Sequence, residues 1–333
     1  MNDQVILEVK NLRTYFTGKE GTVPAVDGIN FSVKEKEVFC IVGESGCGKT
    51  VTSLSILNLI PSSAGRIMEG SSIKLKGKEL AGLDDKEMCD IRGNDIAMIF
   101  QDPMTSLNPV LTIGKQLMEP VMRHLNMKKK DAKEYVIELL DKVGIPSPEA
   151  RVNEYPYELS GGMRQRVMIA MALSCNPKIL IADEPTTALD VTIQAQILDL
   201  MLELKEKIDA SVIMITHDLG VVADIADTIM VMYAGNTMEH GNSWQIFRNP
   251  LHPYTQGLLA SIPRLDKRVD RLHSIMGTVP KLYLGIEGCK FYSRCPYATE
   301  KCIREIPPLY NVKDEYGENH QVSCWKYEDS TGE

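Results

Sequence analysis

Short apolar runs bounded by glycine and proline alternate along the chain with longer segments of helical periodicity. The strand-like runs occupy residues 5–9, 29–33, 38–42, 179–183, 212–216 and 229–233. Segments with apolar positions at helical spacing lie at residues 51–60, 128–143, 164–174 and 191–207. Strands that alternate with helices predict an α/β fold with a mostly parallel sheet covered on both faces.

Two regions depart from this alternation. Prolines mark the start of residues 105–160, and a helix-periodic segment follows within them. We therefore expect a helical subdomain at about residues 103–165. From about Asn242, proline and aromatic residues become more frequent and the periodicity fades. These changes predict a main domain over residues 1–240 and a small appended domain over residues 241–333.

Composition narrows the class of protein. Of the 333 residues, 44% are hydrophobic and 25% are charged, which is the usage of a globular chain. The 37 basic and 45 acidic residues give a net charge of −8, which argues against nucleic acid as the main partner. No apolar run approaches the roughly 18 residues of a membrane helix, and residues 1–8 lack the pattern of a signal peptide. We expect a cytoplasmic chain that acts at a membrane only by docking.

A glycine-rich octapeptide carries the clearest chemistry. Residues 43–50 are Gly-Glu-Ser-Gly-Cys-Gly-Lys-Thr, directly after an apolar strand and before a predicted helix. Glycines let backbone N–H groups turn around phosphate oxygens, and the helix presents its positive end to the same anion. The pattern predicts a nucleotide site in which Lys49 contacts the β- and γ-phosphates and Thr50 coordinates Mg²⁺. The other predicted binding positions are Gly43, Ser45, Gly46, Cys47 and Gly48.

The apolar run at residues 179–183 ends in two adjacent carboxylates. Asp183 is placed to hold Mg²⁺, directly or through water. Glu184 is placed to polarise an attacking water molecule. Together with the phosphate loop, this strand end is a strong indication of a nucleotide site with Mg²⁺ and a positioned water molecule.

Residues 159–165 are Leu-Ser-Gly-Gly-Met-Arg-Gln, which closely resembles the signature sequence of ATP-binding cassette (ABC) ATPases. Ser160 can cap the following helix, and Gly161 and Gly162 allow close approach to a phosphate. The resemblance covers roughly residues 4–240. It implies a P-loop NTPase fold, RecA-like, with an N-terminal antiparallel β part. It also implies roles for Gln101 in the Q-loop (catalysis and Mg²⁺), Asp190 in the D-loop, His217 as the switch histidine, and Phe16, or Tyr15 beside it, as the ring stacked on adenine.

The same resemblance implies that two cassettes meet head to tail. Each ATP would lie between Lys49 of one subunit and the Ser160 loop of the other. Closure would complete the site and hydrolysis would reopen it. Lone cassettes are therefore expected to be poor ATPases.

Residues 249–256, 262–264 and 102–109 resemble segments of dipeptide and oligopeptide importer ATPases. This resemblance implies a subunit that powers peptide import from the cytoplasmic face of the membrane, to which it binds peripherally. Its implied partners are a paralogous ATP-binding subunit (or a second copy in isolation), two transmembrane permeases and an extracytoplasmic peptide-binding protein. Residues 101–125 are the candidate permease contact. Relatives of this family also carry nickel and other solutes, so the solute stays open.

Four cysteines crowd near the C-terminus with the spacing C-x5-C-x6-C-x21-C, at Cys289, Cys295, Cys302 and Cys324. In a reducing compartment such a group indicates metal ligands before disulfides. Four thiolates suit Zn²⁺ or an iron–sulfur cube, the spacing does not choose between them, and His320 is a rival ligand. Unrelated buried cysteines or disulfides are the remaining alternative. The segment resembles the cysteine motif of dipeptide-permease ATPases, which implies a [4Fe–4S] cluster with a structural role or a redox-regulatory one.

Cys47 lies within the phosphate loop near a predicted helix N-terminus, a position that lowers a thiol pKa. This position predicts that thiol reagents inhibit the ATPase activity and that bound ATP protects against the inhibition. The plainer interpretation is a small residue that the loop tolerates.

Two other classes of function are weighed against the importer subunit. A soluble ABC ATPase that acts on ribosomes or DNA would carry two cassettes or a long coiled coil, whereas this chain has one cassette and a short helical insertion. A redox or metal sensor that only retains a nucleotide fold would not need Lys49, Asp183, Glu184 and His217 together.

Overall fold

The structure is a computed structural model that describes residues 4–19, 21–185, 191–262, 274–280 and 285–330. The chain forms two compact units, which are described separately. The first unit takes residues 34–37 and 83–214, and the second takes residues 5–33, 38–82 and 215–333.

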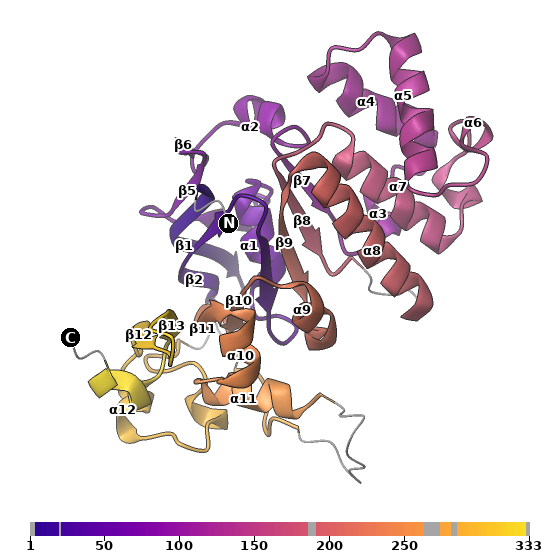
Figure 1. The fold of residues 1–333 in the computed structure, drawn as a ribbon. Helices are drawn as coiled ribbons and strands as arrows, with labels where there is room; N and C mark the ends of the chain where they lie inside the picture. Colours follow the sequence, from indigo (N-terminus) through magenta and orange to yellow (C-terminus); the bar gives the residue numbers. More distant parts are fainter. Residues whose placement is uncertain (1–3, 20, 186–190, 263–273, 281–284, 331–333) are drawn as a thin grey trace. The chain divides into compact units, whose positions relative to one another are not determined.

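An antiparallel sheet opens the second unit (Figure 1). Its strands are β1 (Val5–Gly18), β2 (Gly21–Lys34), β4 (Gly65–Ile67), β5 (Ser72–Leu75) and β6 (Lys78–Glu79), in the order β2-β1-β5-β6 with β4 also paired to β1. The first two strands are much longer than the predicted residues 5–9 and 29–33. Pro24 lies inside β2. It is tolerated there because β2 is an edge strand, where one side of the backbone needs no N–H for the ladder.

A second group of strands in this unit carries the phosphate loop. In spatial order these are β3 (Val38–Val42), β10 (Thr228–Tyr233), β11 (Asn236–Asn242), β13 (Asn319–Val322) and β12 (Tyr310–Lys313). β3 and β10 run parallel, and the later pairs are antiparallel. All five residues of β3 are buried, as its unbroken apolar run predicts.

The helices of the second unit are short. They are α1 (Lys49–Ile56), α9 (Leu219–Ile225), α10 (Ser243–Arg248), α11 (Pro253–Ala260) and α12 (Glu300–Arg304), with 3₁₀ turns at Tyr292–Arg294 (η3) and Trp325–Ser330 (η4). Helix α1 ends before the predicted residue 60, because Asn58 adopts a positive φ of 49°.

The first unit joins a short parallel pair to a group of helices. β7 (Ile96–Ile99) pairs in parallel with β8 (Ile179–Asp183). The helices are α2 (Asp85–Ile91), α3 (Pro103–Ser106), α4 (Ile113–His124), α5 (Lys129–Lys142), α6 (Pro148–Arg151), α7 (Gly161–Leu173) and α8 (Val191–Ile208), with a 3₁₀ turn, η1 (Pro156–Glu158). Strand β9 (Ser211–Thr216) lies where the chain passes from the first unit to the second.

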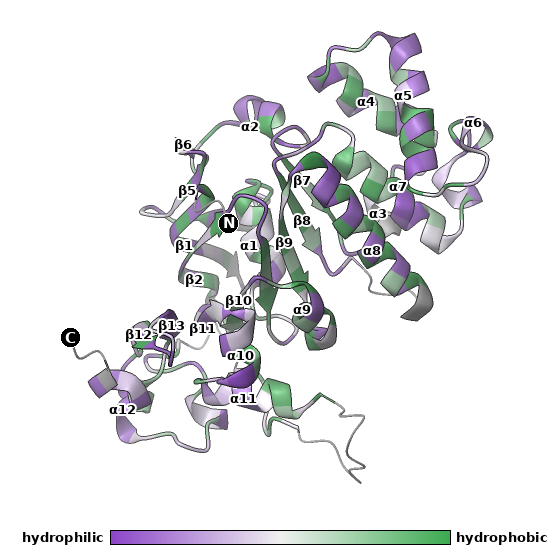
Figure 2. Ribbon diagram, viewed as in Figure 1, coloured by the Kyte–Doolittle hydropathy of each residue, from purple (hydrophilic) through white to green (hydrophobic). Residues whose placement is uncertain are grey.

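Helices α4, α5 and α7 pack on one another and form the predicted helical insertion (Figure 1). The buried side chains of α5 are Ala132, Val136, Leu139 and Leu140, which is the face that the helical periodicity predicts. The buried strands have a different hydropathy pattern from this helix. Figure 2 shows that β8 and β9 are mostly hydrophobic, while α5 alternates between hydrophilic and hydrophobic positions. Within the described ranges, every helix is too short or too polar to span a bilayer.

Candidate functional site

The phosphate loop runs from the end of β3 to the start of α1 and is held by backbone contacts. Gly43, Gly46 and Gly48 all have positive φ values, of 154°, 78° and 104°. A Cβ atom on Gly43 would lie 2.2 Å from the Met232 carbonyl oxygen, and one on Gly48 would lie 2.3 Å from the Ala25 carbonyl oxygen. Only glycine fits these close approaches, so the sequence dictates the shape of the loop.

Lys49 opens α1 and turns back over the loop. Its ammonium donates to the carbonyl oxygens of Gly43 at 2.8 Å and Glu44 at 3.2 Å. Lys49 is buried, whereas Ser45 and Thr50 are exposed. The loop therefore offers open backbone and a hydroxyl to solvent around a buried cation, an arrangement suited to a polyphosphate and Mg²⁺.

The prediction of a reactive Cys47 is wrong. Its side chain is 1% exposed, and burial raises its pKa, which outweighs the lowering effect of Lys49. Its carbonyl accepts a hydrogen bond from the Gly235 N–H at 2.9 Å. Cys47 therefore acts as a packing residue of the loop. The sequence pattern showed its position near a helix N-terminus, which lowers a thiol pKa, but not its burial, which raises it.

The acidic residues and the Q-loop glutamine lie in the first unit. Asp183 ends β8 and is 2% exposed. Glu184 follows it with a left-handed φ of 45°, a conformation that costs a non-glycine residue about 1 kcal/mol. The Gln101 Nε2 donates to the Glu184 Oε2 at 3.0 Å. The structure thus brings together two of the predicted catalytic side chains.

The signature segment precedes α7 in the same unit. Ser160 caps this helix, since its Oγ accepts a hydrogen bond from the Met163 N–H at 3.3 Å. The helix therefore begins at Gly161 rather than at the predicted residue 164. A Cβ on Gly161 would meet no atom of the described residues within 4 Å, so packing against those residues does not require glycine there. The buried Gln165 side chain donates to the Pro185 carbonyl oxygen and ties the start of α7 to the segment after β8.

The remaining predicted residues are more dispersed. His217 is exposed just after β9, and Asp218 caps α9 beside it. Phe16 is half-buried in β1 opposite Gly65. The Tyr15 hydroxyl donates to Asp27 at 2.7 Å, and burial together with this bond raises its pKa to about 12, so Tyr15 is already engaged. Asp190 lies outside the described residues.

The predicted site residues thus divide between the two units. Gln101, the acidic pair and the Ser160 segment belong to the first unit, whereas the phosphate loop, His217 and Phe16 belong to the second.

A cavity of about 240 Å³ in the second unit gathers all four C-terminal cysteines. The four are free thiols. Among the described residues, no three His, Cys, Asp or Glu side chains form a group that could hold a single metal ion. The other residues that line the cavity are His252, Phe291, Tyr292, Tyr297, Thr299, Lys301, Pro307, Trp325, Lys326 and Glu328.

Burial raises the pKa of three of these thiols, that of Cys289 to about 11 and those of Cys295 and Cys324 by less. Two cations lie over the aromatic walls of the cavity. The Lys301 ammonium is 3.8 Å from the centre of the Trp325 ring, and the Lys326 ammonium is 4.3 Å from that of Tyr297. The Lys301 ammonium also binds the Glu328 carboxylate, at 2.5 Å and 2.7 Å, so its charge is largely balanced already. Lys326 adds positive charge near the thiols, which can help to balance bound anionic thiolates.

The prediction of His320 as a rival ligand is wrong. Its Nε2 lies 2.8 Å from a Glu239 carboxylate oxygen, both side chains are buried, and it does not line the cysteine cavity. His252 lines the cavity instead. Burial lowers the pKa of His252 to about 4, and its Nδ1 accepts a hydrogen bond from the Tyr254 N–H at 3.0 Å.

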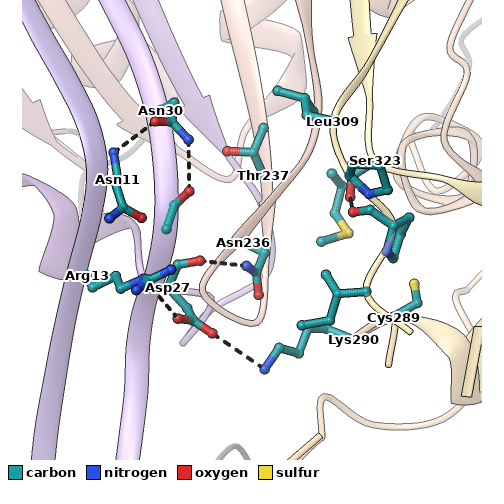
Figure 3. Close-up of a pocket in the computed structure, with 15 residues that line it drawn as sticks. Asn11, Arg13, Asp27, Asn30, Asn236, Thr237, Cys289, Lys290, Leu309 and Ser323 are labelled. Atoms are coloured by element: carbon teal, nitrogen blue, oxygen red, sulfur yellow. Dashed lines mark hydrogen bonds and ion pairs between the residues drawn. The ribbon is translucent and has the colours of Figure 1, made fainter. Parts of the chain in front are cut away.

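A second cavity, of about 360 Å³, also has Cys289 in its wall (Figure 3). Lys290, which follows Cys289, points across it, and its ammonium lies 3.8 Å from the Asp27 carboxylate. The Asp27 backbone carbonyl accepts from the Asn236 side-chain amide at 2.8 Å. The sequence did not single out Lys290 or Asp27, because nothing in their local pattern marks a contact over 263 positions of separation (290 − 27).

Two family models match the chain. One is described as "ABC transporter" and matches residues 26–187, and the other as "Oligopeptide/dipeptide transporter, C-terminal region", matching residues 238–302.

Among curated proteins of Bacillus subtilis (strain 168), the oligopeptide transport ATP-binding protein AppD is 53% identical, covering 98% of each chain. The dipeptide transport ATP-binding protein DppD is 54% identical over 96% of this chain and 94% of its own length. The oligopeptide transport ATP-binding protein OppD is 52% identical over 96% of this chain and 88% of its own length.

Solved structures match the main part of the chain. A dimeric post-hydrolysis state of the ATP-binding cassette MJ0796 bound to ADP and Pi has a TM-score of 0.64 and 28% identity, covering 71% of this chain and 98% of that one. The structure of cbiO1 from Clostridium perfringens has a TM-score of 0.60 and 27% identity, covering 74% and 92%.

Proposed function

The chain belongs to the ATP-binding subunits of ABC transporters, in their peptide-transport branch. On that premise, we propose that it powers the import of di- or oligopeptides by hydrolysing ATP. The observation that carries the proposal is the identity of more than half of all residues, over nearly the whole length of both chains, with a peptide-transport ATP-binding protein. The chain has the predicted P-loop ATPase fold, with an antiparallel β part and helical insertion.

ATP binds on the phosphate loop in this proposal. The backbone of Gly43, Ser45, Gly46, Cys47 and Gly48 surrounds the phosphates, and the open positions of Ser45 and Gly46 support this placement. Lys49 exchanges its two carbonyl partners for β- and γ-phosphate oxygens, which are better acceptors because they are charged. The exposed Thr50 hydroxyl, Asp183 and Gln101 hold Mg²⁺.

Hydrolysis requires a positioned water molecule. We assign Glu184 as its general base, with Gln101 and His217 as the side chains that position water and the γ-phosphate. The hydrogen bond between Gln101 and Glu184 supports this assignment, because it orients the carboxylate before substrate arrives. Phe16 is the candidate adenine platform, since the Tyr15 hydroxyl is engaged by Asp27.

Two cassettes meet head to tail in the proposed assembly, with the Ser160, Gly161 and Gly162 amides facing the ATP of the other subunit. The open space that the described residues leave around Gly161 supports it, because a glycine that they do not require permits close approach from outside. Asp190 would lie at the same interface. The second cassette is a paralogous subunit, or another copy of this chain when it is alone.

The permeases dock on the first unit at residues 101–125 in this proposal. Met104 and Val110 are 63% and 75% exposed there. Tyr157, two residues before the signature segment, is 65% exposed. Exposed apolar side chains of this kind support a protein contact. The chain would thus lie peripherally on the cytoplasmic face of the membrane, and an extracytoplasmic protein would deliver the peptide to the permeases.

We assign the cysteine cavity to a [4Fe–4S] cluster held by Cys289, Cys295, Cys302 and Cys324, with Zn²⁺ as the alternative. The fit rests on four thiols around one cavity and on the positive charge of Lys326 at its wall. A cube binds each thiolate at a separate iron, so it needs thiols around a shared volume rather than at one point. The group would cross-link a segment that has little regular structure.

The proposed division of the chain follows from these roles. Residues 1–240 form the ATPase cassette, with its helical subdomain at about residues 103–165, and residues 241–333 form the extension that holds the cluster. The transporter C-terminal family match, which begins at residue 238, supports this boundary.

Uptake of labelled di- and tripeptides tests the proposal, with nickel measured in parallel. Cells that lack the chain would be complemented with wild type, Glu184→Gln, or Glu203→Gln, an exposed glutamate paired with Lys207 that serves as the matched control. Wild type and the control should restore peptide uptake, and Glu184→Gln should bind ATP but lose at least about 100-fold in turnover. Restored nickel uptake with no peptide defect would overturn the solute class, and turnover by Glu184→Gln at the wild-type rate would overturn the base.

A further inference from the structure

Arg294 links the cysteine segment to the phosphate loop. It directly precedes Cys295, and its guanidinium binds the Glu44 carboxylate through two hydrogen bonds, of 2.6 Å from Nη1 and 3.0 Å from Nη2. Glu44 is the second residue of the phosphate loop. The arginine side chain is 4% exposed and that of Glu44 is 28% exposed, so the guanidinium is buried while the carboxylate keeps partial contact with water.

The rest of the guanidinium is equally fixed. Its Nε donates to the Met276 carbonyl at 3.0 Å, Nη2 to the Ile275 carbonyl at 3.2 Å, and Nη1 to the Tyr233 hydroxyl at 3.2 Å. Together with the two bonds to Glu44, these contacts employ every N–H donor of the group. Such a side chain holds one position and transmits any displacement of its own backbone to its partner.

Glu44 is tied at each of its polar groups. Its carboxylate is held by Arg294, its N–H donates to the Tyr254 hydroxyl at 2.9 Å, and its carbonyl accepts from the Lys49 ammonium at 3.2 Å. Glu44 therefore connects Arg294 directly to the lysine that is placed to contact phosphate.

An aromatic cluster fills the space between the cysteine cavity and the loop. The ring centres of Tyr233 and Tyr254 are 4.7 Å apart, and Phe291 lies 5.3 Å from each. His252 is 5.7 Å from Phe291, and both line the cysteine cavity. A change in the cavity wall therefore reaches Tyr254, whose hydroxyl holds the Glu44 amide, through packed side chains.

The cysteine segment has a second anchor near the loop, at Lys290 (Figure 3). Its partner Asp27 donates its backbone N–H to the Gly235 carbonyl at 2.8 Å, and the Gly235 N–H donates to the Cys47 carbonyl at 2.9 Å. The residues beside Cys289 and Cys295 thus both lead to the phosphate loop, by separate routes.

We propose that Arg294 is a positioning residue that holds the phosphate loop in its ATP-binding shape, and that the four-cysteine site sets the affinity for ATP through it. The first half rests on the contacts above. The second half also rests on the proposed metal group. Arg294 acts in two ways, because it fixes Glu44 in place and neutralises a carboxylate next to the site of a polyanion.

Equilibrium binding of a fluorescent ATP analogue to the purified full chain tests the first half. Arg294→Met should raise the Kd about tenfold, as expected for loss of charged hydrogen bonds. Arg294→Lys should recover part of the loss, since it restores the charge without the paired geometry. Arg304→Met is the control, because Arg304 lies in the same segment and forms an exposed ion pair with Glu300, and the Kd of this variant should equal that of wild type.

A double variant separates positioning from general damage. Arg294→Met combined with Glu44→Gln removes the uncompensated carboxylate and should recover part of the affinity that Arg294→Met loses. In the assembled transporter, Arg294→Met should raise KM and leave kcat within about twofold of wild type. A wild-type Kd in Arg294→Met, or a double variant no better than the single one, would overturn the role of Arg294.

Cys295→Ser, with iron and acid-labile sulfide assayed in the same anaerobic preparations, tests the coupling. It should lose the iron and raise the Kd about as much as Arg294→Met, and the two changes should not add when combined. Loss of iron with an unchanged Kd would overturn the coupling alone. Absence of iron from the wild-type protein would instead overturn the proposed cluster, and the comparison of Arg294 variants would still decide the first half.

Discussion

The phosphate loop and the cysteine segment are both built from irregular chain, yet they are held in different ways. The loop is fixed by its backbone, since Gly43 and Gly48 each lie so close to a carbonyl oxygen that a Cβ would clash. The cysteine segment is stabilised by side chains, through one buried arginine, one buried lysine and four thiols around a cavity. A backbone-held site is complete before its ligand arrives, whereas a site of thiols depends on what binds them.

The largest effect is expected where the backbone contact is closest. Gly48→Ala would place a Cβ 2.3 Å from the Ala25 carbonyl oxygen at a positive φ, so we expect loss of ATP affinity by at least about 100-fold. The control is Gly82→Ala, which has a similar positive φ but nothing within 4 Å, and it should bind ATP normally. Isothermal titration with ATP measures both. Near-normal affinity of Gly48→Ala would remove the basis for a backbone-held loop.

A cysteine substitution should separate the two regions. Cys302→Ser should abolish iron binding and lower ATP affinity by no more than about tenfold, because the loop keeps its own backbone contacts. Cys89→Ser is the matched control, since Cys89 lies in α2 of the other unit and should leave the iron content unchanged. Iron assay and ATP titration on the same preparations give both quantities. Retention of full iron by Cys302→Ser would contradict the ligand set.

The cysteine segment also contains a close backbone approach, at Gly288, which makes a smaller test. A Cβ on Gly288 would lie 2.2 Å from the Cys302 carbonyl oxygen, whereas one on Gly285 would meet nothing within 4 Å. Gly288→Ala should lower the thermal midpoint by about 5 °C and leave ATP affinity within about threefold. Gly285→Ala adds only the backbone strain of a positive φ of 67° and should lower the midpoint less. Differential scanning calorimetry measures the shift. Equal midpoints for the two variants would show that this contact contributes nothing to the segment.

The sequence predicts best what short-range pattern determines. Residues 38–42 and 179–183 are strands to the residue, because a continuous apolar run suits a strand buried on both faces. Strands β1 and β2 are longer than predicted, since half-exposed strands continue through polar residues and one edge proline.

For the candidate site as well, residues within a short motif were predicted and contacts between distant residues were not. The glycine-rich loop, Gln101 and Glu184 were each found from motifs in which the residue has a chemical role, whereas the hydrogen bond between Gln101 and Glu184 was seen only in the structure. The Arg294–Glu44 pair was missed, because its partners are 250 residues apart and neither belongs to a spacing pattern. The pKa of Cys47 was predicted in the wrong direction, because burial of its side chain raises the pKa and a local sequence pattern does not show burial.

The smallest effect on ATP affinity is expected from substitution of Cys47. In the phosphate loop cysteine serves as a packing residue, whereas in the cysteine segment the four thiols are the proposed ligands. This thiol is buried in the loop with a raised pKa, so little thiolate is present at neutral pH and alkylation is slow. Cys47→Ser should keep ATP affinity within about threefold of wild type. Iodoacetamide labelling followed by mass spectrometry should modify Cys89, which is partly exposed, before Cys47. Because only the thiolate reacts, labelling of Cys47 should accelerate as the pH rises toward its raised pKa. Labelling of Cys47 as fast as Cys89 at neutral pH, with protection by ATP, would restore a reactive thiol in the loop and erase this difference between the regions.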